Sequence, residues 1–303
     1  MDVVGLGQIS LDRVAALRSW PRAGEKLELA EPATARPGGQ VATAVLAAVR
    51  LGLSGRLLAA VGADADAELA LAPLRAAGVD VAGVARIPAT PTRSALILVG
   101  RDGERAVLGY RDTRLALRPA DLSREAIRSA RALLVDAEDP DAARWAIGVA
   151  REAAVASVLD ADRADPDRIA VACGADFPIV SESFCADLSK SDPASDDAVQ
   201  ECLAQLARGR ARMAVVTCGA RGARAWCGGA WLERPAHAVD AIDTTGAGDA
   251  FRGAFAWALL AGASAPRVLA LASVAAALAC RAEGAQGALP TATEVEAALR
   301  GSR

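Results

Sequence analysis

The chain has 303 residues, 53% of them hydrophobic, so it is long enough to bury a large core in one large or two ordinary domains. Its formal net charge of −3 makes nucleic acid and anionic membranes poor candidates as partners. A single histidine, His237, excludes a site built from several histidines, and six cysteines without a CxxC pair fit a reducing cytoplasm. The longest apolar run, residues 268–280, is too short to span a membrane.

Short apolar runs that end in glycine, aspartate or serine alternate along the chain with helix-length segments. Such buried strands between helices favour a mostly parallel sheet covered on both faces, with ligands bound beyond the carboxyl ends of the strands. The predicted strands are 2–7, 55–62, 132–137, 155–162, 177–183 and 213–219. The predicted helices are 40–51, 65–77, 139–153, 194–207, 246–262, 266–281 and 291–300.

Two segments, 8–36 and about 90–113, alternate with a period of two and lack the helix period. The second indicates a hairpin with Asp102 and Gly103 at its turn. Both segments are too small to be domains. We therefore expect a single domain over residues 1–303, with the two segments paired as a small lid sheet. The exposed face of that sheet would be apolar, which predicts a homodimer through the lid.

The sequence DTTGAGD, residues 243–249, places a glycine turn and a carboxylate at the start of an apolar helix. The unpaired N–H groups of a helix start and the helix dipole attract an anion. Asp249 could accept a proton from a hydroxyl there, while the amides of Gly246, Ala247 and Gly248 hold a transferred anionic group. Taken alone, the pattern fits equally well an aspartate that only caps the helix.

A second glycine motif, RPGGQVATAVLAAVRLG, lies at residues 36–52. Taken with four other segments, it resembles the ribokinase-like (PfkB) family of carbohydrate kinases over essentially the full length. These segments are DTTGAGD, GLGQISLDR at the first strand, VVTCGARGA at 215–223 and EGAQGALP at 283–290. The resemblance implies an α/β three-layer sandwich with a mostly parallel central sheet and a small β-sheet lid. It also implies an ATP-dependent sugar kinase that needs Mg²⁺.

The resemblance assigns a role to each matching position. Asp249 would be the general base, and the Gly246–Gly248 amides would form the anion hole. Asp12 would bind sugar hydroxyls, although it could equally be an ordinary strand-end carboxylate, and Thr217 could be a simple turn hydroxyl. The implied substrate positions are Asp12, Gly38, Gly39, Thr43 and Arg93; the implied nucleotide positions are Thr217, Gly219, Gly222, Ala276 and Cys280; and a monovalent cation such as K⁺ would lie at Asp243 and Thr245.

The chain departs from the family pattern at two places. Thr43 stands where many members have asparagine, which changes how the sugar is held. The usual Asn-x-x-Glu, which organises magnesium, appears as the segment 181–184, Ser-Glu-Ser-Phe, with Glu182 out of register. Magnesium is still needed to neutralise the nucleotide phosphates, but the sequence indicates no protein ligand for it.

The substrate class stays open between a neutral and an anionic sugar. Lys26, Arg93, Arg105 and Arg111 lie in or beside the lid segments, and we expect them to be solvated charges around a neutral sugar. The alternative is a phosphosugar or sulfosugar clamped by Lys26 and Arg93. Glu138 stands where the similar sulfosugar kinases have a polar or basic residue, which argues against a sulfonate. A catalytically silent nucleotide- or sugar-binding sensor is the third possibility, and the presence of Asp249 argues against it.

Overall fold

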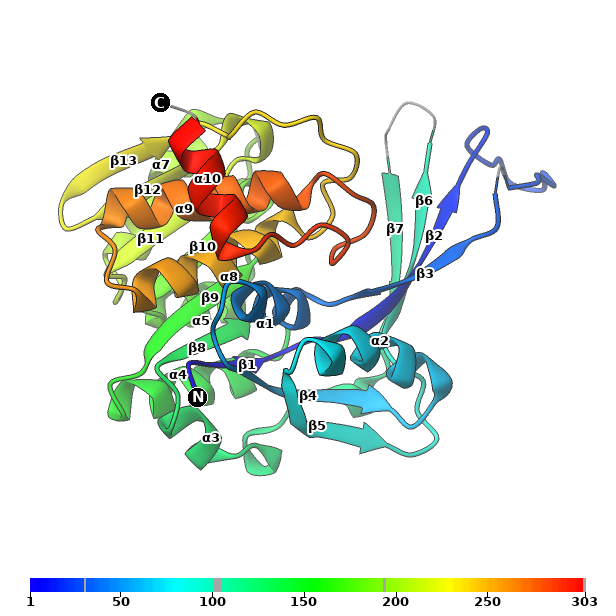
Figure 1. Ribbon diagram of the computed structural model, residues 1–303, viewed down its shortest axis with the longest axis horizontal. Helices are drawn as coiled ribbons and strands as arrows, with labels where there is room; N and C mark the ends of the chain where they lie inside the picture. Colours follow the sequence, from blue (N-terminus) through cyan, green and yellow to red (C-terminus); the bar gives the residue numbers. More distant parts are fainter. Residues whose placement is uncertain (30, 101–104, 193–194, 302–303) are drawn as a thin grey trace.

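The large sheet accounts for most of the strands predicted from the sequence. The structure is a computed structural model that describes residues 1–303 except 30, 101–104, 193–194 and 302–303. Within these residues the sheet has nine strands in the spatial order β13-β12-β11-β10-β9-β8-β1-β4-β5, and only β12 and β13 run antiparallel to their neighbours (Figure 1). The bounds are β1 Val3–Leu6, β4 Gly55–Gly62, β5 Asp80–Ile87, β8 Ala132–Asp136, β9 Ala156–Ala161, β10 Phe177–Ser181, β11 Met213–Thr217, β12 Ala223–Cys227 and β13 Ala230–Arg234.

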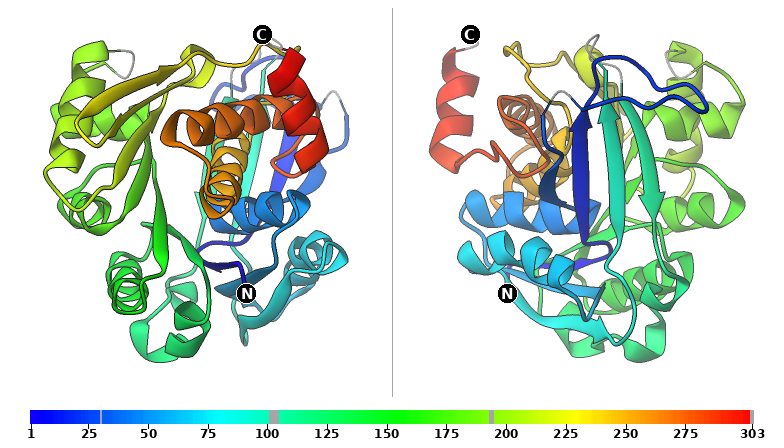
Figure 2. Two further views of the ribbon diagram at one scale, coloured as in Figure 1. Left: turned by 60° about the vertical axis from the view of Figure 1, so that its left-hand side comes forward. Right: turned by 90° about the vertical axis from the view of Figure 1, so that its right-hand side faces the viewer.

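Helices cover both faces of this sheet, as Figure 2 shows. Side chains that alternate along a strand enter two separate cores: Val3 packs in the first and Val4 in the second. The first core lies under α1 Gln40–Arg50, α2 Ala65–Ala76, α8 Ala247–Leu260, α9 Ala265–Ala279 and α10 Ala292–Gly301. The second lies under α3 Arg124–Arg128, α4 Pro140–Glu152, α5 Pro166–Gly174, α6 Glu182–Ser189 and α7 Asp196–Ala207. The three-layer sandwich is confirmed.

A second, smaller sheet stands off the core at one end of the molecule (Figure 1). Its strands are β2 Ser10–Ala16, β3 Thr34–Gly38, β6 Ser94–Val99 and β7 Arg105–Tyr110, in the order β3-β2-β6-β7. The expected hairpin is therefore present as the antiparallel pair of β6 and β7, and its expected turn at Asp102 and Gly103 lies outside the described residues. The lid sheet is confirmed, but the described part of 17–33 contains no strand.

Several elements escaped the sequence pattern. The strand expected over 177–183 ends at Ser181, because the Ser181 hydroxyl accepts a hydrogen bond from the Phe184 amide and so starts helix α6. The edge strand β5 is half exposed and lacks an apolar run. The hairpin of β12 and β13 turns at Gly228 and Gly229, both with positive φ, which is a recognisable signal in the sequence. Short 3₁₀ turns also occur at Thr113–Leu115, Pro119–Asp121 and Gly219–Arg221.

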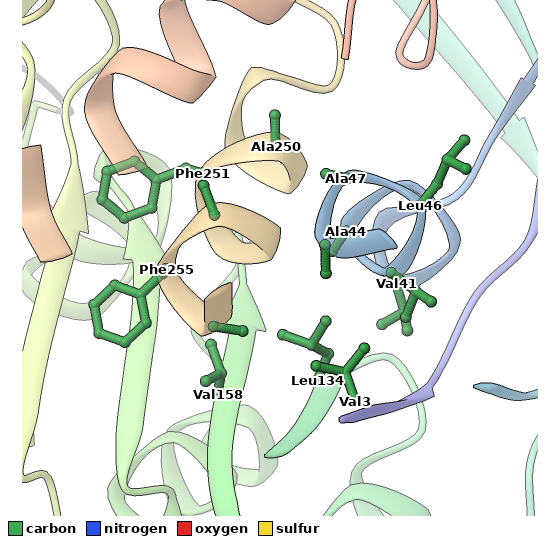
Figure 3. Packing of buried hydrophobic residues seen from close by; sticks show 14 of the residues in the cluster. Val3, Val41, Ala44, Leu46, Ala47, Leu134, Val158, Ala250, Phe251 and Phe255 are labelled. Atoms are coloured by element: carbon green, nitrogen blue, oxygen red, sulfur yellow. The ribbon is translucent and has the colours of Figure 1, made fainter. Parts of the chain in front are cut away.

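Helices α1 and α8 pack closely against each other in the first core. A Cβ on Gly253 would lie 2.4 Å from the Ala44 carbonyl oxygen, so only glycine permits this approach. The Phe255 ring of α8 packs against Phe177 in a tilted arrangement, with centroids 5.5 Å apart, and lies near Val158 in Figure 3. The contact holds the first turns of α1 and α8, both preceded by glycines, on the same face of the sheet.

Candidate active site

The turn that opens α8 has the backbone geometry of an anion-binding helix start. Gly246 is the N-cap with a left-handed backbone (φ 78°), and no side chain caps the helix. A Cβ on Gly246 would lie 2.6 Å from the Ala285 backbone, so both conformation and space demand glycine. Of the three expected amides, that of Ala247 donates to the Thr244 carbonyl at 3.2 Å, a long bond that a bound anion would have to replace.

Asp249 lies in the first turn of α8, with its side chain 14% exposed. Burial is the largest effect on this carboxyl and raises its pKa well above the usual value, and the nearby carboxylates of Asp160, Asp136 and Asp162 raise it further. Arg252, whose Nη1 lies 3.9 Å from Oδ1 of Asp249, opposes the shift. A carboxylate with a raised pKa is closer to the working range of a general base than an ordinary aspartate.

The expected sugar-binding residues meet at the junction of β2 and β3. A Cβ on Gly38 would lie 2.6 Å from Oδ2 of Asp12, and Gly39 combines a φ of 98° with a site 2.5 Å from the Gln8 carbonyl oxygen. Burial raises the pKa of Asp12, while a hydrogen bond from Ser10 and the charge of Arg93 lower it. The structure therefore brings Asp12, both glycines and Arg93 together.

A cleft of about 580 Å³ separates the lid from the core. The lid contributes Asp12 and Arg36, and the core contributes the loops 241–245 and 283–285. Arg36 bridges the cleft with an ion pair to Glu283 at 2.7 Å. The Gly246 turn packs against Ala285, a wall residue of the cleft, so the helix start borders it.

Of the expected residues, Asp12, Asp243 and Thr245 line this cleft, and the others lie outside its lining, Thr43, Cys280 and Lys26 among them. Thr43 is completely buried and accepts a hydrogen bond from Nε2 of Gln286 at 3.3 Å. Cys280 is buried, and its Sγ donates to the Ala276 carbonyl. Lys26 is exposed and lines none of the cavities found in the described chain. The buried Thr43 and Cys280 side chains are thus engaged inside the protein.

The expected nucleotide turn follows β11. Gly222 has a φ of 94°, and a Cβ there would lie 2.1 Å from the Arg234 carbonyl oxygen. Gly219 also has positive φ, and the Thr217 hydroxyl at the strand end donates to the Val180 carbonyl at 3.3 Å. Glu182 is ion-paired with Arg221, which also contacts Asp196 at 2.8 Å. This pairing occupies the one carboxylate of the segment 181–184.

The aspartate that opens the signature connects two loops. Oδ1 of Asp243 accepts the Thr245 amide and Oδ2 accepts the Gly284 amide, both at 2.8 Å. Among the described residues no group of three or more histidine, cysteine or acidic side chains is arranged to hold a metal. A monovalent cation at Asp243 and Thr245 stays a prediction, since the observed contacts give Asp243 a bracing role.

Sequence reasoning missed three charged residues buried behind Asp249. Asp136 and Asp160 end the adjacent strands β8 and β9 in register, and burial raises their pKa values to about 7 and about 6. Asp136 accepts the Gln8 amide at 2.8 Å, and Asp160 is ion-paired with Arg252. The signal was present as aspartates at the ends of two predicted strands, but the residue that pairs with Asp160 could not be read from spacing.

A lid-covered cleft, beside a helix start that offers amides and a carboxylate of raised pKa, suits an enzyme that transfers an anionic group to a hydroxyl. A family profile described as "pfkB family carbohydrate kinase" matches residues 2–292, and the chain belongs to this family of kinases. Within the described residues, none of the helices has the length and apolarity needed to cross a bilayer.

Relatives agree with this assignment. The chain is 32% identical over 269 residues to the ATP-dependent ribose-1-phosphate kinase of Halopiger xanaduensis, covering 86% of both chains. It is 29% identical over 299 residues to the ribokinase of Lactococcus lactis, covering 97% of this chain and 96% of the relative. Its fold matches the Arabidopsis thaliana ribokinase structure complexed with ribose and ATP, with a TM-score of 0.86 at 22% identity over 99% of this chain and 98% of the other.

Proposed function

We propose that this carbohydrate kinase transfers the γ-phosphoryl group of ATP to a sugar hydroxyl, with Asp249 as the general base. The hydroxyl oxygen forms the new bond to phosphorus, the bond to the leaving ADP breaks, and the hydroxyl proton passes to Asp249. The Gly246–Gly248 amides stabilise the charge on the transferred group. The observation that carries the proposal is a carboxylate of raised pKa in the first turn of a helix that a glycine opens.

The residues near the nucleotide turn fit phosphate better than they fit a metal. Gly219 and Gly222 shape the backbone after β11, and the start of α8 offers N–H groups. Mg²⁺, when bound with the nucleotide, would neutralise the phosphate charge. Glu182 is held by Arg221, so we assign it no magnesium contact.

We infer that the acceptor is a neutral sugar held by Asp12 and the Gly38–Gly39 backbone. A largely buried carboxylate beside two glycines without side chains is suited to hydroxyl groups. The similarity to a ribokinase supports this choice. An anionic sugar is the second candidate, because Arg93 lies close enough to Asp12 to influence its charge and because the Halopiger relative is a ribose-1-phosphate kinase. Lys26, the other half of the expected clamp, lines neither the cleft nor the cavity beside Arg93.

ATP consumption on a panel of free and phosphorylated sugars tests this proposal. The panel would contain ribose, deoxyribose, fructose and their monophosphates, with Asp249→Asn as the blank. We expect turnover on a free sugar. Turnover confined to phosphorylated sugars would establish the second candidate, and nucleotide binding without turnover on any sugar would contradict the assignment of Asp249.

We further propose that residues 1–303 act as one domain that dimerises through the lid. Leu96, Val107, Leu108 and Tyr110 expose apolar surface on β6 and β7. Light scattering at micromolar concentration should give a mass near twice 30.8 kDa. A monomer that persists at that concentration would count against the dimer. A cytoplasmic location stays a prediction that rests on the free cysteines.

A further inference from the structure

Arg252 is the one positively charged side chain among the buried residues of the described chain. It lies three residues after Asp249 on α8 and is 6% exposed. A buried guanidinium is costly unless it is paired, so its neighbours must repay its removal from water. Apart from its effect on the pKa of Asp249, Arg252 has no assigned role in the active site described above.

The guanidinium of Arg252 joins three separate elements. It forms an ion pair with Asp160 at the end of β9, and its Nη2 donates to the Ile179 carbonyl of β10 at 3.2 Å. Its Nη1 lies 3.9 Å from Oδ1 of Asp249. The same nitrogen lies under the glycine turn, since a Cβ on Gly248 would approach it to 2.7 Å. A planar group with five donors can make such a bridge, and the point charge of lysine cannot.

The charges around Asp249 are unbalanced without this residue. Asp160 of β9, Asp136 of β8 and Asp162 after β9 all disfavour a negative charge on Asp249, and Arg252 is the group that favours it. Oδ2 of Asp160 and the Nε of Arg252 are buried without a hydrogen-bond partner in the described structure. A cavity of about 10 Å³ beside them, lined by Gln40, has room for about one water molecule.

We propose that Arg252 is a positioning residue of the transfer reaction, which holds the Gly248 turn and Asp249 against the ends of β9 and β10. The inference rests on the proposed role of Asp249. Because Arg252 favours the ionised form of Asp249, it also extends the activity to lower pH. The base works when deprotonated, so activity falls as the pH falls through the pKa of Asp249, and losing Arg252 moves this fall to higher pH.

The test compares Arg252→Gln, Arg252→Lys and the double variant Asp160→Asn/Arg252→Gln. Arg267→Gln serves as the control, because Arg267 is an exposed arginine of α9 with an ion pair to Glu296 at 2.7 Å. For each, kcat, both KM values, the pH profile of kcat and the melting temperature are measured. Arg252→Gln should lower kcat about tenfold to a hundredfold with KM little changed, as expected for a displaced catalytic group. The acidic limb should move up by about one pH unit, and Arg252→Lys should recover part of it.

The double variant separates positioning from folding. It leaves no unpaired carboxylate at position 160, so it should regain much of the melting temperature that Arg252→Gln loses. Because the bridge is still missing, its kcat should stay at least about tenfold low. A wild-type kcat in Arg252→Gln, or a kcat fully restored in the folded double variant, would overturn the proposal. If Arg252→Gln does not fold, the kcat of the double variant and of Arg252→Lys decides.

A separate variant tests the assignment of Asp249 as the general base. In Asp249→Asn the arginine and its partners remain, so wild-type turnover of that variant would reject Asp249 as the base. The comparison of Arg252→Gln with the double variant would still decide whether Arg252 positions the turn.

Discussion

Helices α1 and α8 begin in similar ways and differ in the residues of their first turns. Both have an N-cap glycine with positive φ, 98° at Gly39 and 78° at Gly246, and neither has a side-chain cap. Helices α2, α5, α6 and α7 instead start at an aspartate or serine whose side chain accepts a backbone N–H. A glycine leaves the first amides of α1 and α8 without a side-chain acceptor, so a ligand can use them.

The acidic residues of the first turn separate the two helices. The first turn of α1 has no acidic residue, whereas that of α8 carries Asp249, with Arg252 behind it. On the proposed assignment, the glycine start provides a binding surface in both places. The charged residues after it would then decide which of the two performs chemistry.

The strongest way to break this comparison is Asp249→Asn. The change keeps the size of the side chain and removes the base, so kcat should fall about a hundredfold or more, with nucleotide affinity little changed. The matched control is Asp165→Asn, because Asp165 caps α5 by accepting the Arg168 amide and lies outside the cleft. Turnover of Asp249→Asn within a few-fold of wild type would reject Asp249 as the base.

A bulky residue in each glycine turn should separate function from stability. Gly248→Val meets the buried Arg252 guanidinium and no backbone atom, so the fold should survive with some loss of stability. Activity should fall about a hundredfold, because the amides lose their approach to the phosphoryl group and Arg252 is displaced. Gly39→Ala instead meets the Gln8 backbone at positive φ, which should cost about 1–3 kcal/mol of stability. Thermal melts and assays of both variants check this. A folded, fully active Gly248→Val would place the anion hole elsewhere.

Arg93→Ala tests which class of sugar binds near the glycine turn that precedes α1. With a neutral sugar, the change should leave KM within about threefold, since a rim charge contributes about 1 kcal/mol at most. With an anionic sugar, it removes a charge-assisted contact and KM should rise about tenfold. Steady-state kinetics with added sulfate as a competitor distinguish the two. A tenfold rise together with sulfate inhibition would reject the neutral sugar and leave the kinase assignment intact.

The smallest expected effect is on stability against pH. Burial raises the pKa of Asp136 to about 7 and that of Asp160 to about 6, so the folded protein holds these protons more tightly than the unfolded chain. Their contribution to stability is present at low pH and is lost as the pH rises through these values. The melting temperature should therefore fall by a few degrees between about pH 5 and about pH 8. Asp136→Asn should flatten this dependence, and a wild-type profile that does not fall would contradict the raised pKa values.

Much of the fold could be predicted because its signals are local. Gly228 and Gly229 show the limit: they mark the hairpin of β12 and β13, yet the flanking runs are too polar to predict as strands. Ser181 shows a second limit, because its hydroxyl starts α6 where the apolar pattern continues a strand. For the site, DTTGAGD placed Asp249 and the turn together, since a helix start and its carboxylate are adjacent in the chain, but it took the other motifs of the family to favour a base over a cap.

The sequence by itself determined the features that depend on residues adjacent in the chain. These are the strand and helix periods, the glycine turns, the hairpin of the lid and the carboxylate at the start of α8. Only the tertiary structure decided which side chains are buried and which charged groups lie next to each other. It buried Thr43, left Lys26 out of the cleft lining, and placed Asp160 against Arg252. The physical reason is that a pKa and a buried ion pair depend on distances across strands and helices, which no local spacing contains.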